Sequence, residues 1–358
     1  MKILHVITSL RIGGAEKLMV DLLPRLRDLG NEVELAVFYG AQTQFVEQLE
    51  EAGIKIHKFG MHSNVYHLNN LIKLRSFFNE FDIIHTHNTA CQLYGTIASL
   101  LKKQMLCTTE HSTSNRRRKS IWLSFFDKWM YSRYDKIICI SKDTEKNLIE
   151  SVGTKKIKTC VINNGIDVKK YAFAKPNLTI LNNTQHIKIF QVAGFRTEKD
   201  QETVIRALTF LPKNFHVYFI GDGERRNICE NLSKQLLVEE RCHFLGIRTD
   251  VPQLLKIADI VVMSSHWEGF GLAAVEGMAA GKPVIATDVA GLREVVKGAG
   301  VLFPHQDYRT LAKEIMRLTE DKEYADQIIR QCQAKAAEYD IKVMAEKYNE
   351  VYKTLTYK

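Results

Sequence analysis

The sequence contains no long apolar segment. None of its hydrophobic runs approaches the roughly 20 residues that a helix needs to cross a bilayer, so we expect no membrane span. The apolar run at Lys2–Ile7 is too short for a secretory signal and is typical of a buried strand. These absences favour a cytoplasmic protein.

Cysteine and proline are also scarce. The cysteines (91, 107, 139, 160, 229, 242 and 332) are odd in number, widely spaced and without a Cys-x-x-Cys pair. This pattern favours reduced thiols over a disulfide framework or a zinc site. With 6 prolines and 20 glycines among 358 residues, a collagenous or low-complexity chain is excluded. The 45% hydrophobic and 25% charged residues are typical of a globular protein.

Positive charge is what the sequence has in excess. Fifty Lys and Arg against 41 Asp and Glu give a formal net charge of +9. Residues 1–170 hold 25 basic and 17 acidic side chains, whereas residues 171–358 hold 25 and 24. The basic first half therefore predicts an anionic partner for that half, and nucleic acid, an acidic membrane surface or a phosphorylated substrate would fit.

Short β-branched apolar runs alternate with longer amphipathic stretches along nearly the whole chain. This alternation predicts βαβ units, and two such series predict an α/β protein with two doubly wound parallel sheets. The expected strands are Lys2–Ile7, Val33–Phe38, Ile54–Lys58, Ile83–Thr86, Met105–Glu110, Lys136–Ile140 and Lys158–Ile162, then Ile187–Val192, His216–Ile220, Cys242–Leu245, Ile260–Met263, Pro283–Thr287 and Gly300–Phe303.

A turn-rich stretch at 163–186 separates the two series. We therefore expect one Rossmann-like domain at 1–170 and a second at 171–340. A helix at about 341–358 ends the chain, and Met344, Tyr348, Val351 and Tyr352 fall on one of its faces.

The strongest local signal is the segment 264–276, which reads SSHWEGFGLAAVE. The apolar run Ile260–Met263 leads into this loop, which opens a helix. In a parallel sheet, ligands lie beyond the carboxyl ends of the strands and face helix N-termini. Gly269 and Gly271 let backbone N–H groups approach a ligand, and the helix dipole favours phosphate. Two glycines alone would fit a structural turn equally well.

The run Glu-Gly-Phe-Gly-Leu-x-x-x-Glu resembles the signature of retaining glycosyltransferases of family 4. The likeness covers nearly the whole chain, because the segments 12–16, 82–88, 109–111, 162–167, 221–223 and 281–287 resemble family segments in the same order. The resemblance implies the GT-B fold, in which two Rossmann-like domains face a central cleft. It also implies a nucleotide-sugar-dependent enzyme of capsular, exopolysaccharide or lipopolysaccharide biosynthesis.

The resemblance implies roles for residues of the second half. Glu276 is similar to the residue that binds the ribose hydroxyls of the nucleotide, and Glu268 resembles the one beside the transferred sugar. Backbone groups of the loop would hold the sugar and the diphosphate, and these belong to Gly269, Phe270, Gly271 and Leu272.

In the first half, His111 resembles a histidine that reaches across the cleft to the donor sugar. Gly13 and Gly14 would let the backbone approach the reaction centre or the diphosphate. An ordinary strand-end histidine and an ordinary strand–helix turn are the alternatives. The resemblance also implies that this domain binds the acceptor and that the helix at about 341–358 packs back on it.

One segment departs from the family's pattern. Members usually show Gly-Arg-Leu-x-x-x-Lys-Gly, whose Arg and Lys neutralise the leaving diphosphate, whereas this chain reads AGFRTEKD at 193–200. Lys199 is at the lysine position, but Gly194 is at the arginine position. Arg196 would supply the second cation if the loop turns it inward. The resemblance implies an enzyme without a bound metal or other cofactor, and the sequence has no Asp-x-Asp motif.

Two further motifs are compatible with different functions. His85 and His87 share a face of a strand with no third ligand nearby, so they would line the acceptor site or be structural. Gly221-Asp222-Gly223 follows a strand but lacks the third glycine and the acidic partner of a nicotinamide-binding motif. A non-catalytic nucleotide-sugar-binding module, a glycoside phosphorylase or a nucleotide-sugar hydrolase on the same fold are the alternatives to a transferase.

A cationic cluster at Arg116–Lys119 precedes apolar residues at helical spacing, namely Ile121, Trp122, Phe125, Phe126, Trp129 and Met130. This combination is typical of interfacial membrane binding, and a core-facing helix is the alternative. Nucleic acid is not expected, because no binding motif accompanies the charge. The resemblance implies retaining transfer of a sugar, preferably from a UDP-sugar, to a glycan or polyprenyl-linked acceptor.

Overall fold

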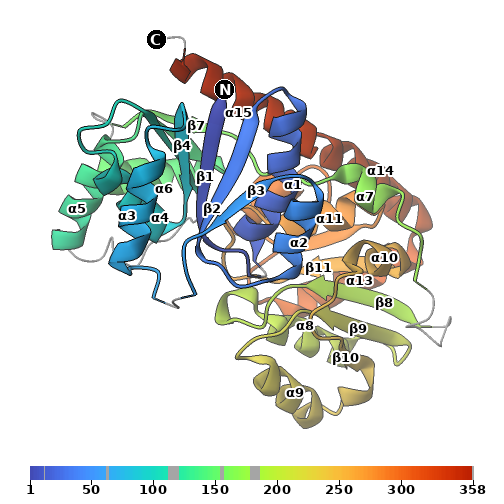
Figure 1. Cartoon of the computed structure of the whole chain (residues 1–358). Helices are drawn as coiled ribbons and strands as arrows, with labels where there is room; N and C mark the ends of the chain where they lie inside the picture. Colours follow the sequence, from blue (N-terminus) through green and yellow to red (C-terminus); the bar gives the residue numbers. More distant parts are fainter. Residues whose placement is uncertain (12, 62–63, 112–120, 154–156, 178–185, 357–358) are drawn as a thin grey trace. The chain divides into compact units, whose positions relative to one another are not determined.

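The computed structural model describes residues 1–11, 13–61, 64–111, 121–153, 157–177 and 186–356, with residues 121–124 described by their backbone alone. The chain forms two compact units (Figure 1), Met1–Gly165 with Ile341–Lys358, and Ile166–Asp340. No helix in these ranges is long and apolar enough to span a membrane.

The first unit contains a parallel sheet of seven strands. Their order is β3-β2-β1-β4-β5-β6-β7, so the winding direction reverses between β1 and β4. The strands are β1 (Lys2–Ser9), β2 (Glu32–Tyr39), β3 (Lys55–Lys58), β4 (Ile83–His87), β5 (Met105–Glu110), β6 (Lys136–Cys139) and β7 (Thr159–Val161).

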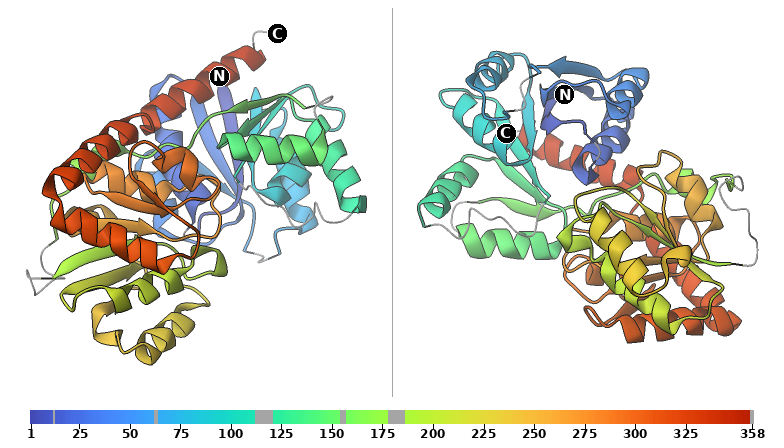
Figure 2. Two further views of the ribbon diagram at one scale, coloured as in Figure 1. Left: turned by 180° about the vertical axis from the view of Figure 1, so that it is seen from behind. Right: turned by 90° about the horizontal axis from the view of Figure 1, so that it is seen from below.

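Helices cover both faces of this sheet (Figure 2). One face packs against α1 (Gly14–Asp28), α2 (Gln44–Glu51) and α15 (Ile341–Thr356). The other packs against α3 (Leu68–Phe77), α4 (Thr89–Ala98), α5 (Ile121–Ser132) and α6 (Lys142–Val152). Because successive residues of a strand point to opposite faces, Ile3 and Ile7 join the first core and Leu4 and Val6 the second.

The second unit repeats the arrangement with six parallel strands in the order β10-β9-β8-β11-β12-β13, which reverses between β8 and β11. The strands are β8 (Ile187–Val192), β9 (Phe215–Ile220), β10 (Cys242–Phe244), β11 (Ile260–Met263), β12 (Val284–Thr287) and β13 (Val301–Phe303). The helices are α7 (Val168–Ala172), α8 (Gln201–Ala207), α9 (Arg226–Gln235), α10 (Val251–Ile257), α11 (Leu272–Ala279), α12 (Leu292–Val296), α13 (Tyr308–Glu320) and α14 (Lys322–Ala337).

The predicted α/β class with two doubly wound sheets is confirmed, and each expected strand is present with ends shifted by a few residues. The units divide after Gly165, whereas we expected the division after residue 170. Residues 166–170 lie in the second unit because α7 packs against α10 and α11. The last helix, α15, lies in the first unit and packs against α1.

Candidate active site

The sequence-predicted charged residues lie beyond the carboxyl ends of β8 and β11, the two strands that flank the reversal of the second sheet. This position is where parallel α/β sheets bind ligands. The loop after β8 leads to a short 3-10 helix, Thr197–Lys199, and the loop after β11 carries Glu268 to the start of α11.

Lys199 and Glu268 form the centre of this region. The Lys199 ammonium donates to the Glu268 carboxylate with Nζ and Oε1 2.6 Å apart, and the Ser265 hydroxyl donates to the same oxygen at 2.9 Å. The Lys199 and Glu268 side chains are 22% and 11% exposed. Because both are largely withdrawn from water, their mutual attraction is stronger than that of a surface pair.

Side chains of β8 and of the loop after β11 hold the Lys199 loop in place. The Lys199 carbonyl accepts hydrogen bonds from Gln191 Nε2 at 3.1 Å and from Ser264 Oγ at 3.2 Å, and these two side chains bond to each other at 3.0 Å. Gln191 and Ser264 are fully buried, so these hydrogen bonds link the two loops inside the core of the second unit. Sequence patterns alone had indicated no role for Gln191, Ser264 or Ser265.

Gly271 of the second loop has little space for a side chain. Gly271 has a φ of 95°, and a Cβ there would lie 2.6 Å from Leu292 Cδ2. Gly271 is the N-cap of α11, and no side-chain hydrogen bond caps this helix. The first N–H groups of a helix have no partner inside the helix, so those of α11 can bind a ligand. The Phe270 ring is buried against the Tyr339 ring, 5.1 Å away in an edge-on contact, which leaves its backbone as the part able to meet a ligand.

Glu276 lies on α11, five residues into the helix counting from Leu272, and is 5% exposed. Glutamates are almost never buried this far unless the carboxylate is paired. Leu272 opens the same helix, so Glu276 and the loop amides are carried by one rigid element.

Arg196 is more exposed than the other predicted cations. Its side chain is 63% exposed, and Nη1 lies 4.0 Å from the nearest Glu198 oxygen. A Cβ built on Gly194 would lie 3.8 Å from Arg196 Nε and 3.5 Å from the Asp222 carbonyl oxygen. The Arg196 side chain therefore runs beside the position where family members carry their arginine.

The glycines at 221 and 223 are explained by packing between loops. A Cβ on Gly221 would lie 2.1 Å from the Ala193 carbonyl oxygen, and one on Gly223 would lie 2.4 Å from that of Phe195. The turn after β9 therefore needs glycine in order to lie against the loop after β8. This steric need accounts for the glycine pair without a nicotinamide cofactor.

In the first unit, Gly13 and Gly14 open α1 and His111 follows β5. Gly13 has an extended backbone, and a Cβ there would contact only the flexible carboxylate of Glu16. His111 is partly buried, and burial lowers its pKa to about 4, so the imidazole is neutral near pH 7. Its Nε2 lies 3.0 Å from His87 Nδ1.

His85 and His87 are fully buried, as is His5 on the neighbouring strand. They therefore belong to the interior, in agreement with the structural alternative for this pair. Among the described residues, these three histidines form the one group whose possible metal-ligand atoms all lie within 4.8 Å of one another. His5 was missed in the sequence because it is 80 residues away from His85, and only the strand order brings them together.

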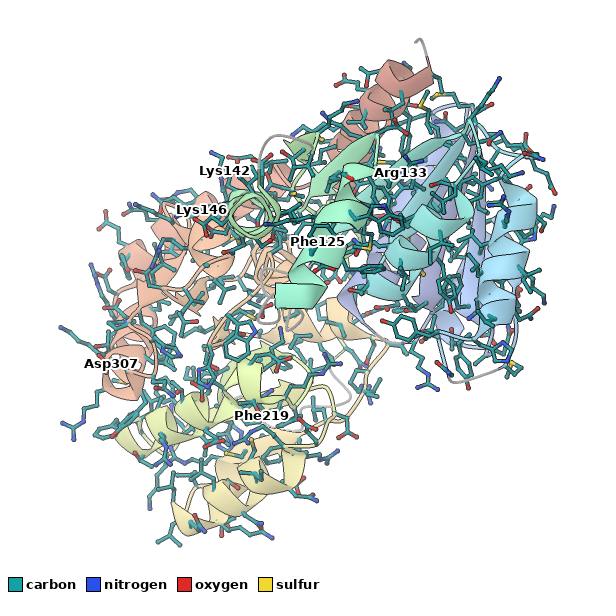
Figure 3. All side chains as sticks on the ribbon, turned by 90° about the vertical axis from the view of Figure 1, so that its left-hand side faces the viewer. Phe125, Arg133, Lys142, Lys146, Phe219 and Asp307 are labelled. Carbon is teal, nitrogen blue, oxygen red and sulfur yellow. The ribbon has the colours of Figure 1, made fainter. Side chains whose placement is uncertain are left out.

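The basic cluster Arg116–Lys119 lies outside the described residues. The helix that follows it, α5, buries Met130 in the core, whereas Phe125 is 75% exposed. The neighbouring helix α6 carries the exposed residues Lys142 and Lys146 (Figure 3). The first unit therefore has two exposed cations on α6 and an exposed aromatic ring on α5.

Family models match the chain in two parts. The model described as Glycosyltransferase Family 4 matches residues 12–170, and the model described as Glycosyl transferases group 1 matches residues 179–335. In addition, the chain is 28% identical over 264 residues to UDP-Gal:alpha-D-GlcNAc-diphosphoundecaprenol alpha-1,3-galactosyltransferase of Escherichia coli, covering 68% of this chain and 67% of the relative.

Two further relatives span nearly the full length. The chain is 23% identical over 361 residues to N,N'-diacetylbacillosaminyl-diphospho-undecaprenol alpha-1,3-N-acetylgalactosaminyltransferase of Campylobacter jejuni, covering 93% of this chain and 94% of the relative. The crystal structure of HepE from Anabaena in complex with UDP and glucose matches with a TM-score of 0.87 at 26% identity, covering 99% of this chain and 100% of the other.

Two doubly wound parallel sheets, with a charged loop at the reversal of the second, place the protein in the glycosyltransferase class with the GT-B fold. Within that class, the chain belongs to glycosyltransferase family 4, and the resemblance seen in the sequence is confirmed.

Proposed function

We propose that the protein transfers a sugar, with retention of anomeric configuration, from a UDP-sugar to a glycan carried on a polyprenyl diphosphate. The observation that carries the proposal is the partly buried Lys199–Glu268 pair beside the glycine loop and α11. Support for the substrates comes from the relatives, whose names include UDP-Gal and diphosphoundecaprenol, and from the HepE complex with UDP and glucose.

The second unit binds the donor in this proposal. Glu276 accepts hydrogen bonds from the ribose hydroxyls, and the amides of Gly269, Phe270, Gly271 and Leu272 hold the sugar and the diphosphate. The Lys199 ammonium has three N–H donors, and its contact with Glu268 uses one, so the others can meet a diphosphate oxygen. Glu268 orients the sugar hydroxyls and supports the positive charge that develops on the ring.

The leaving diphosphate is stabilised by fixed charge. As the bond to the anomeric carbon breaks, negative charge grows on the diphosphate, and Lys199, Arg196 and the N-terminus of α11 are placed in the proposal to meet it. A metal ion is then not required. The diphosphate accepts the proton of the incoming hydroxyl on the same face, so the reaction retains configuration without a protein base.

The first unit binds the acceptor in this proposal, with His111, Gly13 and Gly14 serving the reacting sugar. The acceptor lipid is held in a membrane, so the enzyme works at the cytoplasmic surface of that membrane. Phe125 of α5 and the cations Lys142 and Lys146 of α6 provide the contact, together with Arg116–Lys119. About 1 kcal/mol per Lys or Arg is the usual gain at an anionic surface.

Acceptor-dependent turnover tests the reaction. The purified protein is incubated with a panel of UDP- and GDP-sugars, with and without polyprenyl-diphosphate-linked glycans, in the presence of EDTA. We expect UDP release only when acceptor is present, and a product whose anomeric proton signal shows retention. UDP release without acceptor would indicate a hydrolase, and donor binding without turnover would indicate a binding module. Formation of a sugar 1-phosphate from a glycan and inorganic phosphate, with no UDP released, would indicate a phosphorylase.

Liposome flotation tests the membrane contact. We expect the protein to float with vesicles containing anionic lipid and not with neutral vesicles. The variant with Phe125→Ser, Lys142→Gln and Lys146→Gln should float less. A matched control neutralises Lys313 and Lys322, which are exposed cations of α13 and α14 in the second unit. Equal flotation of both variants would contradict the proposed surface.

A further inference from the structure

A continuous chain of hydrogen-bonded side chains leads from α15 to His111. Strand alternation places His5 of β1, His85 and His87 of β4 and Thr109 of β5 on one face of the sheet. The strands are adjacent, with His5 paired to His85 and His87 paired to Thr109 in the ladder. This face is the one that α15 covers (Figure 2, left), although α15 follows the whole second unit in the sequence.

In the series of hydrogen-bonded side chains, the half nearest His111 consists of imidazoles. His111 Nε2 lies 3.0 Å from His87 Nδ1, and His87 Nε2 lies 3.0 Å from His5 Nδ1. His5 and His87 stack nearly parallel, with ring centroids 5.3 Å apart, and both are fully buried. The ring of His111 is thus held through one of its nitrogens.

The other half of the chain ends on two tyrosines of α15. The Tyr352 hydroxyl lies 3.3 Å from His5 Nε2 and 2.6 Å from His85 Nδ1. His85 Nε2 lies 2.8 Å from Thr109 Oγ1, which lies 2.9 Å from the Tyr348 hydroxyl. All of these side chains are fully buried, so no solvent interrupts the chain.

Burial keeps the imidazoles neutral, and this restricts the direction in which the hydrogen bonds between the side chains can run. Burial lowers the pKa of His5 to about 3 and that of His111 to about 4, and it lowers the pKa of His85 and His87 as well. A neutral imidazole donates from one nitrogen and accepts at the other. His5, His87 and His111 are joined nitrogen to nitrogen, so their rings must donate in the same direction, either toward His111 or away from it. His85 is joined to His5 through the Tyr352 hydroxyl, and it follows that direction when this hydroxyl accepts from one ring and donates to the other.

The two directions differ at the Tyr348 end. If every group donates toward His111, the Tyr348 hydroxyl starts the chain by donating to Thr109, and each buried hydrogen has an acceptor. If every group donates away from His111, the hydroxyl hydrogen of Tyr348 has no acceptor among the described residues. A buried unpaired hydroxyl is costly, so the direction toward His111 is favoured.

We infer that Tyr348 and Tyr352, together with the buried histidines His5, His85 and His87, are positioning residues that hold the ring of His111 as the neutral Nδ1–H tautomer. His111 then offers a hydrogen-bond donor, at the one ring nitrogen without a partner among the described residues, to an oxygen of the reacting sugar. The inference rests on the proposed function for the role of His111 toward the sugar, but the tautomer itself needs no substrate.

A metal site is the competing account of the three buried histidines. Each of the six ring nitrogens of His5, His85 and His87 is already within hydrogen-bond distance of a neighbouring group. A bound ion would have to break several of these bonds. The hydrogen-bonded chain is therefore the better account, and bound metal is one outcome of the test.

The test is nitrogen NMR of the full-length protein labelled with ¹⁵N-histidine, with the His111 signals assigned by their loss in His111→Gln. We expect a protonated Nδ1 and an unprotonated Nε2 in the wild type at pH 7.5. In Tyr352→Phe the link between His85 and His5 is broken, so the His111 signals should move toward a mixture of tautomers. The kcat of transfer should fall several-fold, with the KM for the donor unchanged.

Tyr134→Phe is the matched control. The Tyr134 hydroxyl is buried in the same unit and also has two partners, Thr86 Oγ1 at 2.9 Å and the Gln92 carbonyl at 2.8 Å, on the opposite face of the sheet. This variant should leave the His111 tautomer unchanged. If Tyr352→Phe does not fold, Tyr348→Phe replaces it, and a detectable Nε2–H fraction is then expected.

Three results would overturn the inference. These are an Nε2–H tautomer in the wild type, unchanged His111 signals in the foldable tyrosine variant, or one equivalent of zinc in the purified protein that is lost in His85→Gln. A protein with the expected tautomer but no transferase activity would instead count against the proposed function, so the two failures can be told apart.

Discussion

The candidate site residues of the two units differ in charge, exposure and distance along the sequence. In the second unit, Lys199 and Glu268 form an ion pair between two loops that follow neighbouring strands. In the first unit, His111 is a neutral ring at the end of a chain of buried neutral groups. Charged groups on loops can exchange one partner for a ligand, whereas a buried neutral chain can only hold its end in place.

This difference has a chemical meaning for the proposed reaction. Loss of a nucleoside diphosphate creates negative charge, which the fixed cations of the second unit are suited to stabilise. The first unit has a different task, because a hydroxyl or a ring oxygen needs orientation by a hydrogen bond. Substitutions in the two units should therefore affect different quantities.

The largest effect is expected for Lys199→Met. The variant removes the cation and leaves the Glu268 carboxylate with the Ser265 hydroxyl as a remaining donor. We expect kcat to fall about 100- to 1000-fold, the range seen when a fixed electrostatic group is removed from an active site. Lys188→Met is the control, because Lys188 also faces a carboxylate, that of Asp259 at 3.8 Å, but at the start of β8. Equal losses would mean that stability, and not charge at the site, is responsible.

A smaller effect is expected for Glu276→Ala, which tests the donor-binding assignment. Hydrogen bonds to a charged group contribute about 1.5–3 kcal/mol, and each 1.4 kcal/mol is a factor of about ten. We therefore expect UDP to bind about ten- to a hundredfold more weakly in a calorimetric titration. Glu323→Ala, an exposed glutamate at the start of α14, should bind UDP like the wild type. Unchanged affinity of Glu276→Ala would remove Glu276 from the donor site.

These contrasts explain how much could be predicted from the sequence. The strands and the charged loop depend on residues close together in the chain, so periodicity and the motif at 264–276 were enough to predict them. The chain of side chains that holds His111 could not be predicted, because its members range from His5 to Tyr352. Their contact depends on strand order and on the return of α15, and neither is encoded in any local pattern.

The helix α15 also shows where prediction from the sequence ends. Its apolar face, with Met344, Tyr348 and Tyr352, was predicted from spacing and is buried. Spacing could not show that two of these side chains would use their hydroxyls inside the core. The partner of each hydroxyl, His85 and Thr109, lies on a strand more than 200 residues earlier.

Lowering the pH should destabilise the first unit more than the second. In the first, burial lowers the pKa of four histidines, namely His5, His85, His87 and His111. Because the unfolded chain binds these protons at a pKa near 6.5 and the folded unit does not, the free energy of unfolding falls as the pH drops below about 6.5. Each such histidine contributes about 1.4 kcal/mol per pH unit.

The second unit should be less sensitive. It has two histidines with lowered pKa, His216 and His243, and the raised pKa of Asp200 acts in the opposite direction, because the folded unit then keeps a proton that the unfolded chain releases. We expect the first unit to lose about 2 kcal/mol more than the second between pH 7 and pH 5.5.

Tryptophan fluorescence during urea unfolding can follow each unit separately. Trp267 lies in the second unit, and the other two tryptophans, at 122 and 129, lie in the first. The Trp267→Phe variant therefore reports on the first unit, and the double variant at 122 and 129 reports on the second. Equal losses of stability in the two variants would contradict the buried neutral state of the first unit's histidines.

The smallest effect is expected at Arg196, the most exposed of the charged residues assigned to the donor. Because its side chain is 63% exposed, we expect Arg196→Ala to lower kcat only about five- to tenfold.

The nearby Gly194 allows a sharper experiment, because a Cβ there would make only ordinary contacts, one of them with Arg196 itself. The double variant with Gly194→Arg and Arg196→Ala should recover most of the lost activity. Gly194→Ala, with no new charge, should change kcat less than twofold. A double variant as slow as Arg196→Ala would show that the cation cannot be moved from position 196 to position 194. The charge that distinguishes the second unit from the first would then be supplied by Lys199 and Glu268 alone.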